Sequence, residues 1–161
     1  MLLFKLYYHI VAFIKLSIYE IIYNKQLELG CHITFRKGFS LIIEQRGGHV
    51  KISDGVFFNN YCTICCHKSI VINKDTIFGE NVKIYDNNHC YRDLSLPIKY
   101  QGYNTESINI GSNCWIASNV IILKGVTIGD NCVIGPGCVI YKDIQPNTVV
   151  VNNQDLFYKQ L

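Results

Sequence analysis

The stretch that decides the fold is IGSNCWIASNVIILKGVTIGDNCVIGPGCVIYKDIQ, residues 110–145. It divides into six hexads, and every hexad begins with isoleucine. Position five holds Cys, Val or Ile, and position four holds Asn, Gly or Asp. Positions five and one lie two residues apart, so they face the same side of an extended segment. The residue types at position four tolerate the positive φ of a tight corner. Each hexad therefore predicts a short strand followed by a corner.

Three such hexads close a triangular coil, and a fixed short period of this kind is typical of β-solenoids. The earlier half of the chain keeps the same period, with a slip of two residues near 65–71 that predicts a bulge. Weaker repeats begin at Ile33, which gives roughly six coils in all. The apolar first positions of the earlier hexads are Ile52, Phe58, Ile64, Ile72, Phe78 and Ile84. Their expected corners are Gly55, Tyr61, His67, Asp75, Asn81 and Asn87.

The eight cysteines fit this pattern without a metal or a disulfide. Cys90 falls on position one, and four others fall on position five, where a small apolar side chain points inward. CTICCH at 62–67 resembles a metal or haem motif, but the extra cysteine breaks the haem spacing, so a structural role is favoured. No secretory leader is evident, which favours a reducing, cytoplasmic setting. The four cysteines at position five are Cys62, Cys114, Cys132 and Cys138.

The length predicts one domain with short appendages. The expected parts are an N-terminal helix over 1–26, a β-helix over 27–150 and a tail over 151–161. The net charge of +3 and the lack of a basic run argue against nucleic acid as a partner.

Residues 2–23 carry a helical rather than a six-residue period. Lys5, His9, Ala12, Lys15 and Glu20 lie towards one side, and the charges disfavour a membrane span. Two interpretations stay open: a cap on the open end of the solenoid, which we favour, or an amphipathic helix on a membrane surface. The opposite, apolar side holds Leu3, Leu6, Tyr7, Ile10, Phe13, Ile14, Ile18, Ile21 and Ile22.

The six-residue rhythm stops after DNNH at 86–89 and resumes about twenty residues later. His89 occupies position six, between Asn88 and Cys90, whose positions are expected to face inward, so its side chain should point outward. An extruded loop is expected over residues 91–107, and such a loop can roof a cleft against a neighbouring subunit.

The hexads, the DNNH motif with its loop, and residues 110–144 together resemble the hexapeptide-repeat acyltransferases. The likeness is strongest to the branch that O-acetylates sugars and surface polysaccharides. This resemblance implies an all-β, left-handed parallel β-helix, a homotrimer with active sites between subunits, and acetyl-CoA as co-substrate. It also implies a hydroxyl of a sugar, surface polysaccharide or glycolipid precursor as the acceptor, no required metal, and a cytoplasmic location that extends to the inner face of a membrane if the helix binds there.

The resemblance also assigns site residues. His89 is the expected general base, the backbone N–H of Ser118 the oxyanion donor, and Asn59 and Trp115 line the substrate site. Pro136 and Ala117 depart from the residues common in the family, and so does the tail after residue 149. Pro136 has no N–H to donate to CoA. The expected contacts of CoA are Ala117, Ser118, Lys124, Pro136, Tyr141, Lys142 and Lys159.

Two alternatives stay open at this stage. An inactive or purely structural β-helix protein would share the repeats. A metal-dependent hydratase of the carbonic-anhydrase type would need several histidines on facing coils, and His49, His67 and His89 do not form a close pair in the sequence.

Overall fold

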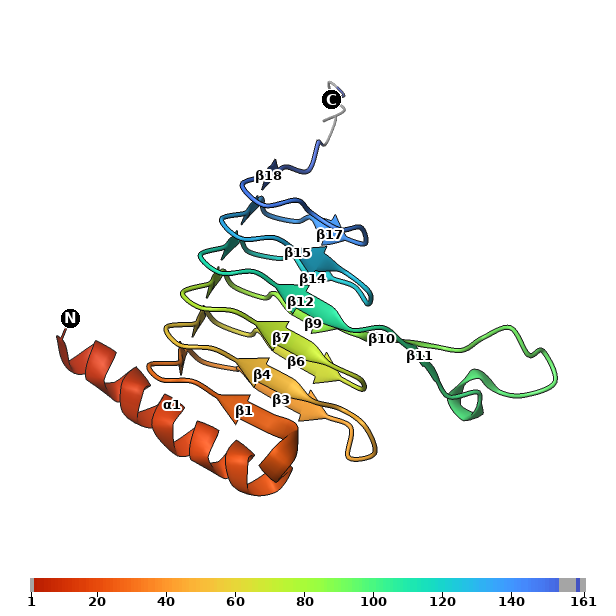
Figure 1. Ribbon diagram of the computed structural model, residues 1–161, viewed down its shortest axis with the longest axis horizontal. Coiled ribbons are helices and arrows are strands. Elements are labelled where there is room, and N and C mark those ends of the chain that lie inside the picture. The colour runs from red at the N-terminus through yellow and green to blue at the C-terminus, as the bar shows by residue number, and fades with distance from the viewer. Residues whose placement is uncertain (1, 154–158, 160–161) are drawn as a thin grey trace.

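The computed structural model describes residues 2–153 and 159. The chain forms a three-sided parallel β-solenoid of about five turns, with one helix across its first end and one hairpin arm projecting from its side (Figure 1). The helix α1 spans Leu2–Tyr23 and continues into the short helix η1, Asn24–Gln26. The expected parallel β-helix with an N-terminal helix and one extruded loop is thus confirmed, with about five turns instead of six.

Each side of the solenoid is one parallel sheet, and consecutive strands along the chain go to different sheets. Sheet A holds β1 (Leu27–Leu29), β4 (Val50–Ile52), β7 (Ile70–Ile72), β12 (Ile108–Ile110) and β15 (Thr127–Ile128). Sheet B holds β2 (Thr34–Phe35), β5 (Phe57–Phe58), β8 (Ile77–Phe78), β13 (Trp115–Ile116), β16 (Val133–Ile134) and β18 (Val149–Val150). Sheet C holds β3 (Ser40–Ile43), β6 (Thr63–Cys66), β9 (Lys83–Tyr85), β14 (Ile121–Ile122) and β17 (Val139–Ile140).

The core consists of the inward rows that the hexads predict. Equivalent residues of successive coils lie in register, as where Ile110 pairs with both Ile72 and Ile128. At the helix end, the rings of Phe35, Phe39, Phe58 and Phe78 follow one another at centroid distances of 4.7–4.8 Å. The four position-five cysteines are buried, as expected: Cys62, Cys114, Cys132 and Cys138.

The corners use the residue types that the hexads place at position four. Asn113, Asn119 and Asn131 have φ values of 55–62°. Their amides form hydrogen bonds between coils, such as Asn113 Nδ2 to Asn131 Oδ1 at 2.8 Å. Positive φ is also found at the expected Gly55, Tyr61, Asp75, Asn81, Gly125 and Gly137. The expectation was wrong for His67, Asn87 and Asp143, which do not have positive φ.

His67 and Asn87 differ because the phase slip near residue 67 is built around a buried carboxylate. Asp86 is fully buried, and its oxygens accept hydrogen bonds from the backbone N–H groups of His67, Lys68 and Ser69 at 2.8, 2.7 and 3.0 Å. The Cys66 thiol donates to the same carboxylate at 3.3 Å. The predicted bulge is therefore present, and Asp86 stabilises it in place of a left-handed corner.

The arm leaves the solenoid directly after Asp86. Strand β10 (Asn87–His89) pairs antiparallel with β11 (Tyr103–Thr105), and the short helix η2 (Ile98–Tyr100) lies between them. Glu106 N donates to Asp86 O at 2.9 Å and closes the base of the arm. The excursion therefore covers residues 87–105 rather than 91–107. The expectation that Asn88 and Cys90 face inward was wrong, because the core alternation ends at Asp86: Asn88 is exposed and Cys90 is half-buried on the arm.

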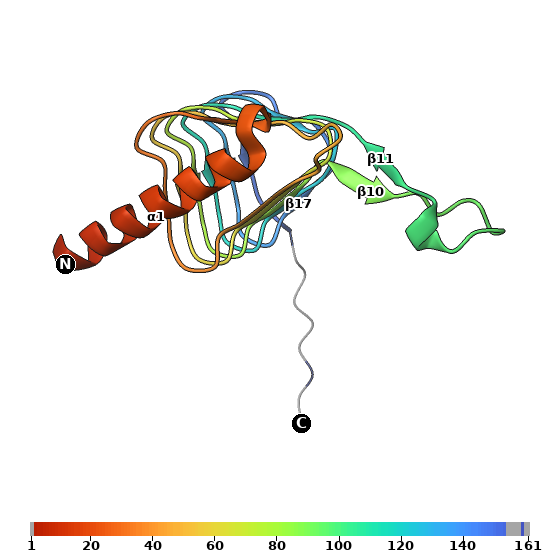
Figure 2. The same cartoon turned by 90° about the horizontal axis from the view of Figure 1, so that it is seen from below.

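Helix α1 covers the open end of the solenoid, as the favoured interpretation expected, but with the opposite face (Figure 2). Ala12 is fully buried against the first coil, and Leu16, Tyr19 and Tyr23 pack beside it. Lys15 Nζ donates to Phe39 O, and Tyr23 OH donates to Leu41 O at 3.1 Å. The apolar side defined by the helical period points away from the core over its described residues, from Leu6 to Ile22, and the side chain of Leu3 lies outside the described part of the chain.

Candidate active site

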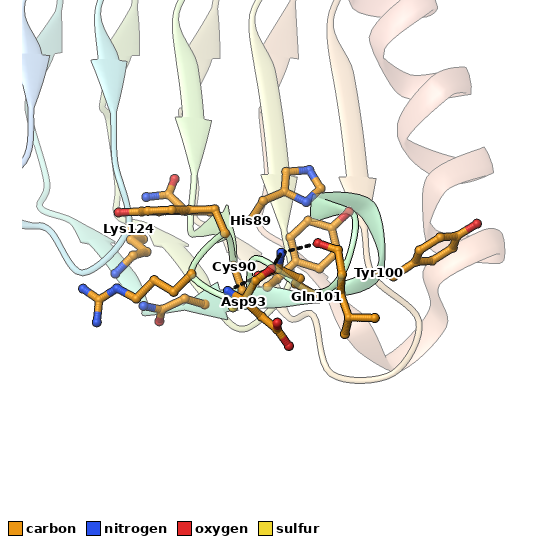
Figure 3. A pocket seen from close by; sticks show the side chains of 12 residues that line it. His89, Cys90, Asp93, Tyr100, Gln101 and Lys124 are labelled. Carbon is orange, nitrogen blue, oxygen red and sulfur yellow. Dashed lines mark hydrogen bonds between the residues drawn. The ribbon is translucent and has the colours of Figure 1, made fainter.

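The largest cleft lies between the arm and the edge where sheet C turns into sheet A (Figure 3). Its volume is about 850 Å³. Lys124, which follows β14, lines the cleft from the solenoid, and the other lining residues belong to residues 88–104 of the arm. His89 lies in this cleft with an exposed side chain, as expected for a residue that must reach a substrate.

The orientation of His89 is set by the ladder at the base of the arm. His89 and Tyr103 are partners in the register of β10 and β11, and their ring centroids lie 4.5 Å apart. The ring of His67, which stands on the bulge, contacts Tyr103 at a centroid distance of 4.3 Å. Tyr103 therefore contacts both histidine rings, and this contact restricts the rotamers open to His89.

The outer part of the arm is organised by its own hydrogen bonds. The side chain of Gln101 donates to the carbonyl oxygens of Asp93 and Leu96 at 2.7 and 2.8 Å, and its oxygen accepts from Asp93 N at 3.1 Å. The Asp93 carboxylate accepts from Ser95 Oγ and Ser95 N. These two bonds lower the pKa of Asp93 below its usual value. The arm is thus a defined turn that can form one wall of a cleft.

Some of the expected CoA contacts lie on the same edge as His89. Lys124 forms an ion pair with Glu106, the residue at which the arm rejoins the solenoid. Tyr141 and Lys142 follow β17 one coil later, where both are exposed and Lys142 Nζ lies 5.6 Å from the ring centroid of Tyr141. This edge therefore presents two lysines along the coil axis towards the C-terminal end.

The other expected residues do not gather there. Asn59, Ala117, Ser118 and Pro136 lie at the edge where sheet B turns into sheet C, so the whole of sheet C separates them from His89. Trp115 stands on the outer face of sheet B with 52% of its surface exposed. Lys159 is exposed and lies within the tail, most of which is outside the described residues.

The edge at Ser118 is closely packed. A Cβ on Gly79 would lie 2.5 Å from Ser118 N, so glycine is required for the two coils to approach. Ser118 Oγ accepts a hydrogen bond from Glu80 N at 3.1 Å, and Ser118 O accepts one from Gly137 N at 3.0 Å. Ala117 is 6% exposed and Pro136 is exposed. A ligand on this edge would therefore meet mainly backbone and small side chains.

Within residues 2–153 and 159, no group of three or more His, Cys, Asp or Glu side chains is placed to hold a metal ion. The nearest histidines to the cleft, His67 and His89, are separated by the Tyr103 ring.

Residues 107–142 match the bacterial transferase hexapeptide family, described as six repeats. This match covers the coils that carry Trp115, Ser118 and Lys124, and the parallel solenoid agrees with it. Over these residues the chain is similar to the bacterial transferase hexapeptide family.

Proteins similar to this chain include some whose names assign them to the acetylation of sugars. WbbJ of Escherichia coli strain K12, assigned by its name to O-acetyl transfer in lipopolysaccharide biosynthesis, is 28% identical over 72% of this chain and 63% of its own. A maltose O-acetyltransferase from Clostridium difficile 630 is 34% identical, with a TM-score of 0.56, over 78% of this chain and 61% of its own. A galactoside acetyltransferase solved with coenzyme A is 28% identical, with a TM-score of 0.64, over 81% of this chain and 63% of its own. The chain spans under two thirds of the length of each of these relatives.

The sequence predicted an extruded arm and singled out His89 as a site residue, but it did not indicate the residues that hold them. Asp86 was noted only as the start of the DNNH motif, although a carboxylate at an inward position is the signal of a buried hydrogen-bonded site. Tyr103 and Gln101 fall in a stretch without periodicity, where nothing in the sequence pairs them with His89 or Asp93.

Proposed function

We propose that this chain transfers the acetyl group of acetyl-CoA to a hydroxyl of a carbohydrate, with His89 as the general base. The observation that carries the proposal is an exposed imidazole, oriented by Tyr103, in an open cleft that also presents Lys124. The sugar acetyltransferases among its relatives support a glycan acceptor, and the coenzyme A in one of those structures supports the donor.

The reaction needs few groups. The His89 imidazole accepts the proton of the acceptor hydroxyl while its oxygen attacks the thioester carbonyl. The carbonyl oxygen becomes an oxyanion, which a backbone N–H at Ser118 would stabilise. The C–S bond then breaks, the ester remains on the sugar, and the imidazolium returns the proton to the thiolate of CoA. An imidazole suits both transfers because its ordinary pKa lies near neutrality.

The position of Ser118 bears on the oligomeric state. Ser118 and Asn59 lie on one edge of the solenoid, and His89 and Lys124 lie on the next. One copy cannot bring both edges to one substrate. A closed ring of three copies can place the His89 edge of one subunit beside the Ser118 edge of its neighbour. The proposal therefore includes a homotrimer, which light scattering would detect as three times the 18.4 kDa chain mass.

The direct experiment follows thiol release from acetyl-CoA in the presence of a panel of acceptors. The panel holds galactosides, maltose and lipopolysaccharide-type oligosaccharides, each beside a matched sugar that lacks a free hydroxyl at the tested position. The proposal expects CoA release that depends on the acceptor, and an added acetyl mass on the sugar. If no acceptor raises CoA release above the rate of hydrolysis, the assignment fails. A monomer that remains fully active on dilution would refute the site between subunits.

A further inference from the structure

Helix α1 carries its apolar side outward, away from the solenoid. Large side chains on this side are 49–81% exposed, although the helix packs on the coil with Ala12, Leu16, Tyr19 and Tyr23. At about 100° per residue, Ile10, Ile14 and Ile21 lie opposite Ala12. The exposed apolar residues described on α1 are Leu6, Tyr7, Ile10, Phe13, Ile14, Ile18, Ile21 and Ile22.

Among the described side chains of α1, the charged groups avoid this outer side. Lys15 donates to Phe39 O on the coil, and Glu20 lines a hollow on one flank together with His9 and Leu29. A helix that serves only as a cap has its polar residues towards water and its apolar residues towards the core. Here the outer side of α1 is apolar as well as the inner side, so it is suited to contact with a second apolar surface. An exposed apolar patch of this extent is typical of an interaction site.

The other flank of α1 is basic. A hollow of about 330 Å³ lies between the first half of α1 and the turn after β2. Lys15, Arg36 and Lys37 line it beside Tyr7, and no acidic residue is among its lining residues. Arg36 and Lys37 are exposed. A cationic hollow that borders an apolar helix face is complementary to an anionic headgroup beside its acyl chains.

We propose that the outer side of α1 lies in the surface of an anionic membrane, with Arg36 and Lys37 at the headgroups. By length and composition, residues Leu6–Gln26 could cross a bilayer. However, α1 lies across the end of the solenoid and packs on it through Ala12, Leu16 and Tyr19, while its first turns extend past the edge of the coils (Figures 1 and 2). A helix held in this way lies parallel to the surface on which the solenoid end rests. The membrane thus covers the apolar side while the cleft beside the arm stays in water.

The test uses the full chain and sedimentation with phosphatidylcholine vesicles, with and without phosphatidylglycerol. The wild-type protein should pellet with the anionic vesicles, and less so as salt is raised. Ile14→Glu with Ile21→Glu should weaken partitioning by more than about 100-fold, because two isoleucine side chains lose their apolar contact. The fold should survive, since these side chains are 53% and 81% exposed. Arg36→Ala with Lys37→Ala should lose roughly 25-fold, at about fivefold per basic side chain.

Leu94→Glu, at an arm residue that is 98% exposed, is the matched control and should bind vesicles like the wild-type protein. Wild-type protein that stays in the supernatant with anionic vesicles overturns the proposal. Loss of binding in the Leu94 variant equal to that in the helix variant also overturns it. If the helix variant lowers the oligomeric mass in vesicle-free solution and the wild-type protein does not bind vesicles, a second copy covers this side instead. None of these measurements needs acetyl-CoA, so they are independent of the proposed reaction.

Discussion

Asp86→Ala should be strongly destabilising because one buried carboxylate satisfies three backbone donors. The N–H groups of His67, Lys68 and Ser69 bind it at 2.7–3.0 Å, and a hydrogen bond to a charged group contributes about 1.5–3 kcal/mol. Some of the three donors will reach water in the variant, because the surrounding side chains are half-buried or exposed. We therefore expect a loss of about 3–5 kcal/mol, a large share of the roughly 5–15 kcal/mol that stabilises a domain.

The assay is urea unfolding followed by the fluorescence of Trp115, the single tryptophan. Asp130→Ala is the matched control. The Asp130 carboxylate also lies at a corner, but it is exposed and accepts a hydrogen bond from Ser112 N of the neighbouring coil at 2.6 Å. It should lose about 1 kcal/mol. If Asp86→Ala does not fold, Asp86→Asn is measured instead and should still lose more than the control. Equal stability of the Asp86 and Asp130 variants would refute the role given to the buried carboxylate.

Further predictions concern the cleft and the thiols. In steady-state assays, Tyr103→Leu should lower kcat roughly tenfold with little change in the KM for acetyl-CoA. Tyr103→Phe keeps the ring that contacts both histidines, so its kcat should stay near that of the wild-type protein. Acetyl-CoA at about 100 times its Kd should raise stability by about 2.7 kcal/mol in a thermal melt, and by less in Lys124→Ala; an unmoved Tm would contradict the donor. Burial and the neighbouring Asp86 raise the pKa of Cys66 from 9.0 to about 12, so a thiol reagent at neutral pH should label the exposed Cys31 and leave Cys66 unmodified. The raised pKa means that the folded state favours the protonated Cys66 thiol. The protein should therefore lose stability as the pH rises above about 9, and urea titration at several pH values measures this loss.

The repeats allowed most of the solenoid to be predicted because each hexad position has one physical task. An isoleucine at position one must face inward, and Asn or Gly at position four allows the corner, as Ile116 and Asn119 illustrate. The bulge at residues 67–69 broke this rule, since its corner depends on a carboxylate seventeen residues or more along the chain. Such long-range satisfaction of backbone donors leaves no local signal.

The candidate site was predictable only in part for a similar reason. His89 stood out because the rhythm stops beside it, but its contact with Tyr103 depends on the register of an antiparallel hairpin without a six-residue period. The orientation of α1 was also misjudged. Periodicity identified two faces correctly, and the expectation that the apolar face covers the core failed because the first coil is covered by Ala12, Leu16 and two tyrosines.

The central claim is that His89 removes the acceptor proton, and the turnover of His89→Ala tests it most directly. The variant should keep its fold and oligomeric mass, because the His89 side chain is exposed and leaves no cavity in the core. With acetyl-CoA and the best acceptor, kcat should fall by roughly 10²–10⁴. The ring of His67 contacts Tyr103 but does not line the cleft, so His67→Ala should lose far less turnover. Near-normal turnover in His89→Ala, together with its loss in His67→Ala, would contradict the account.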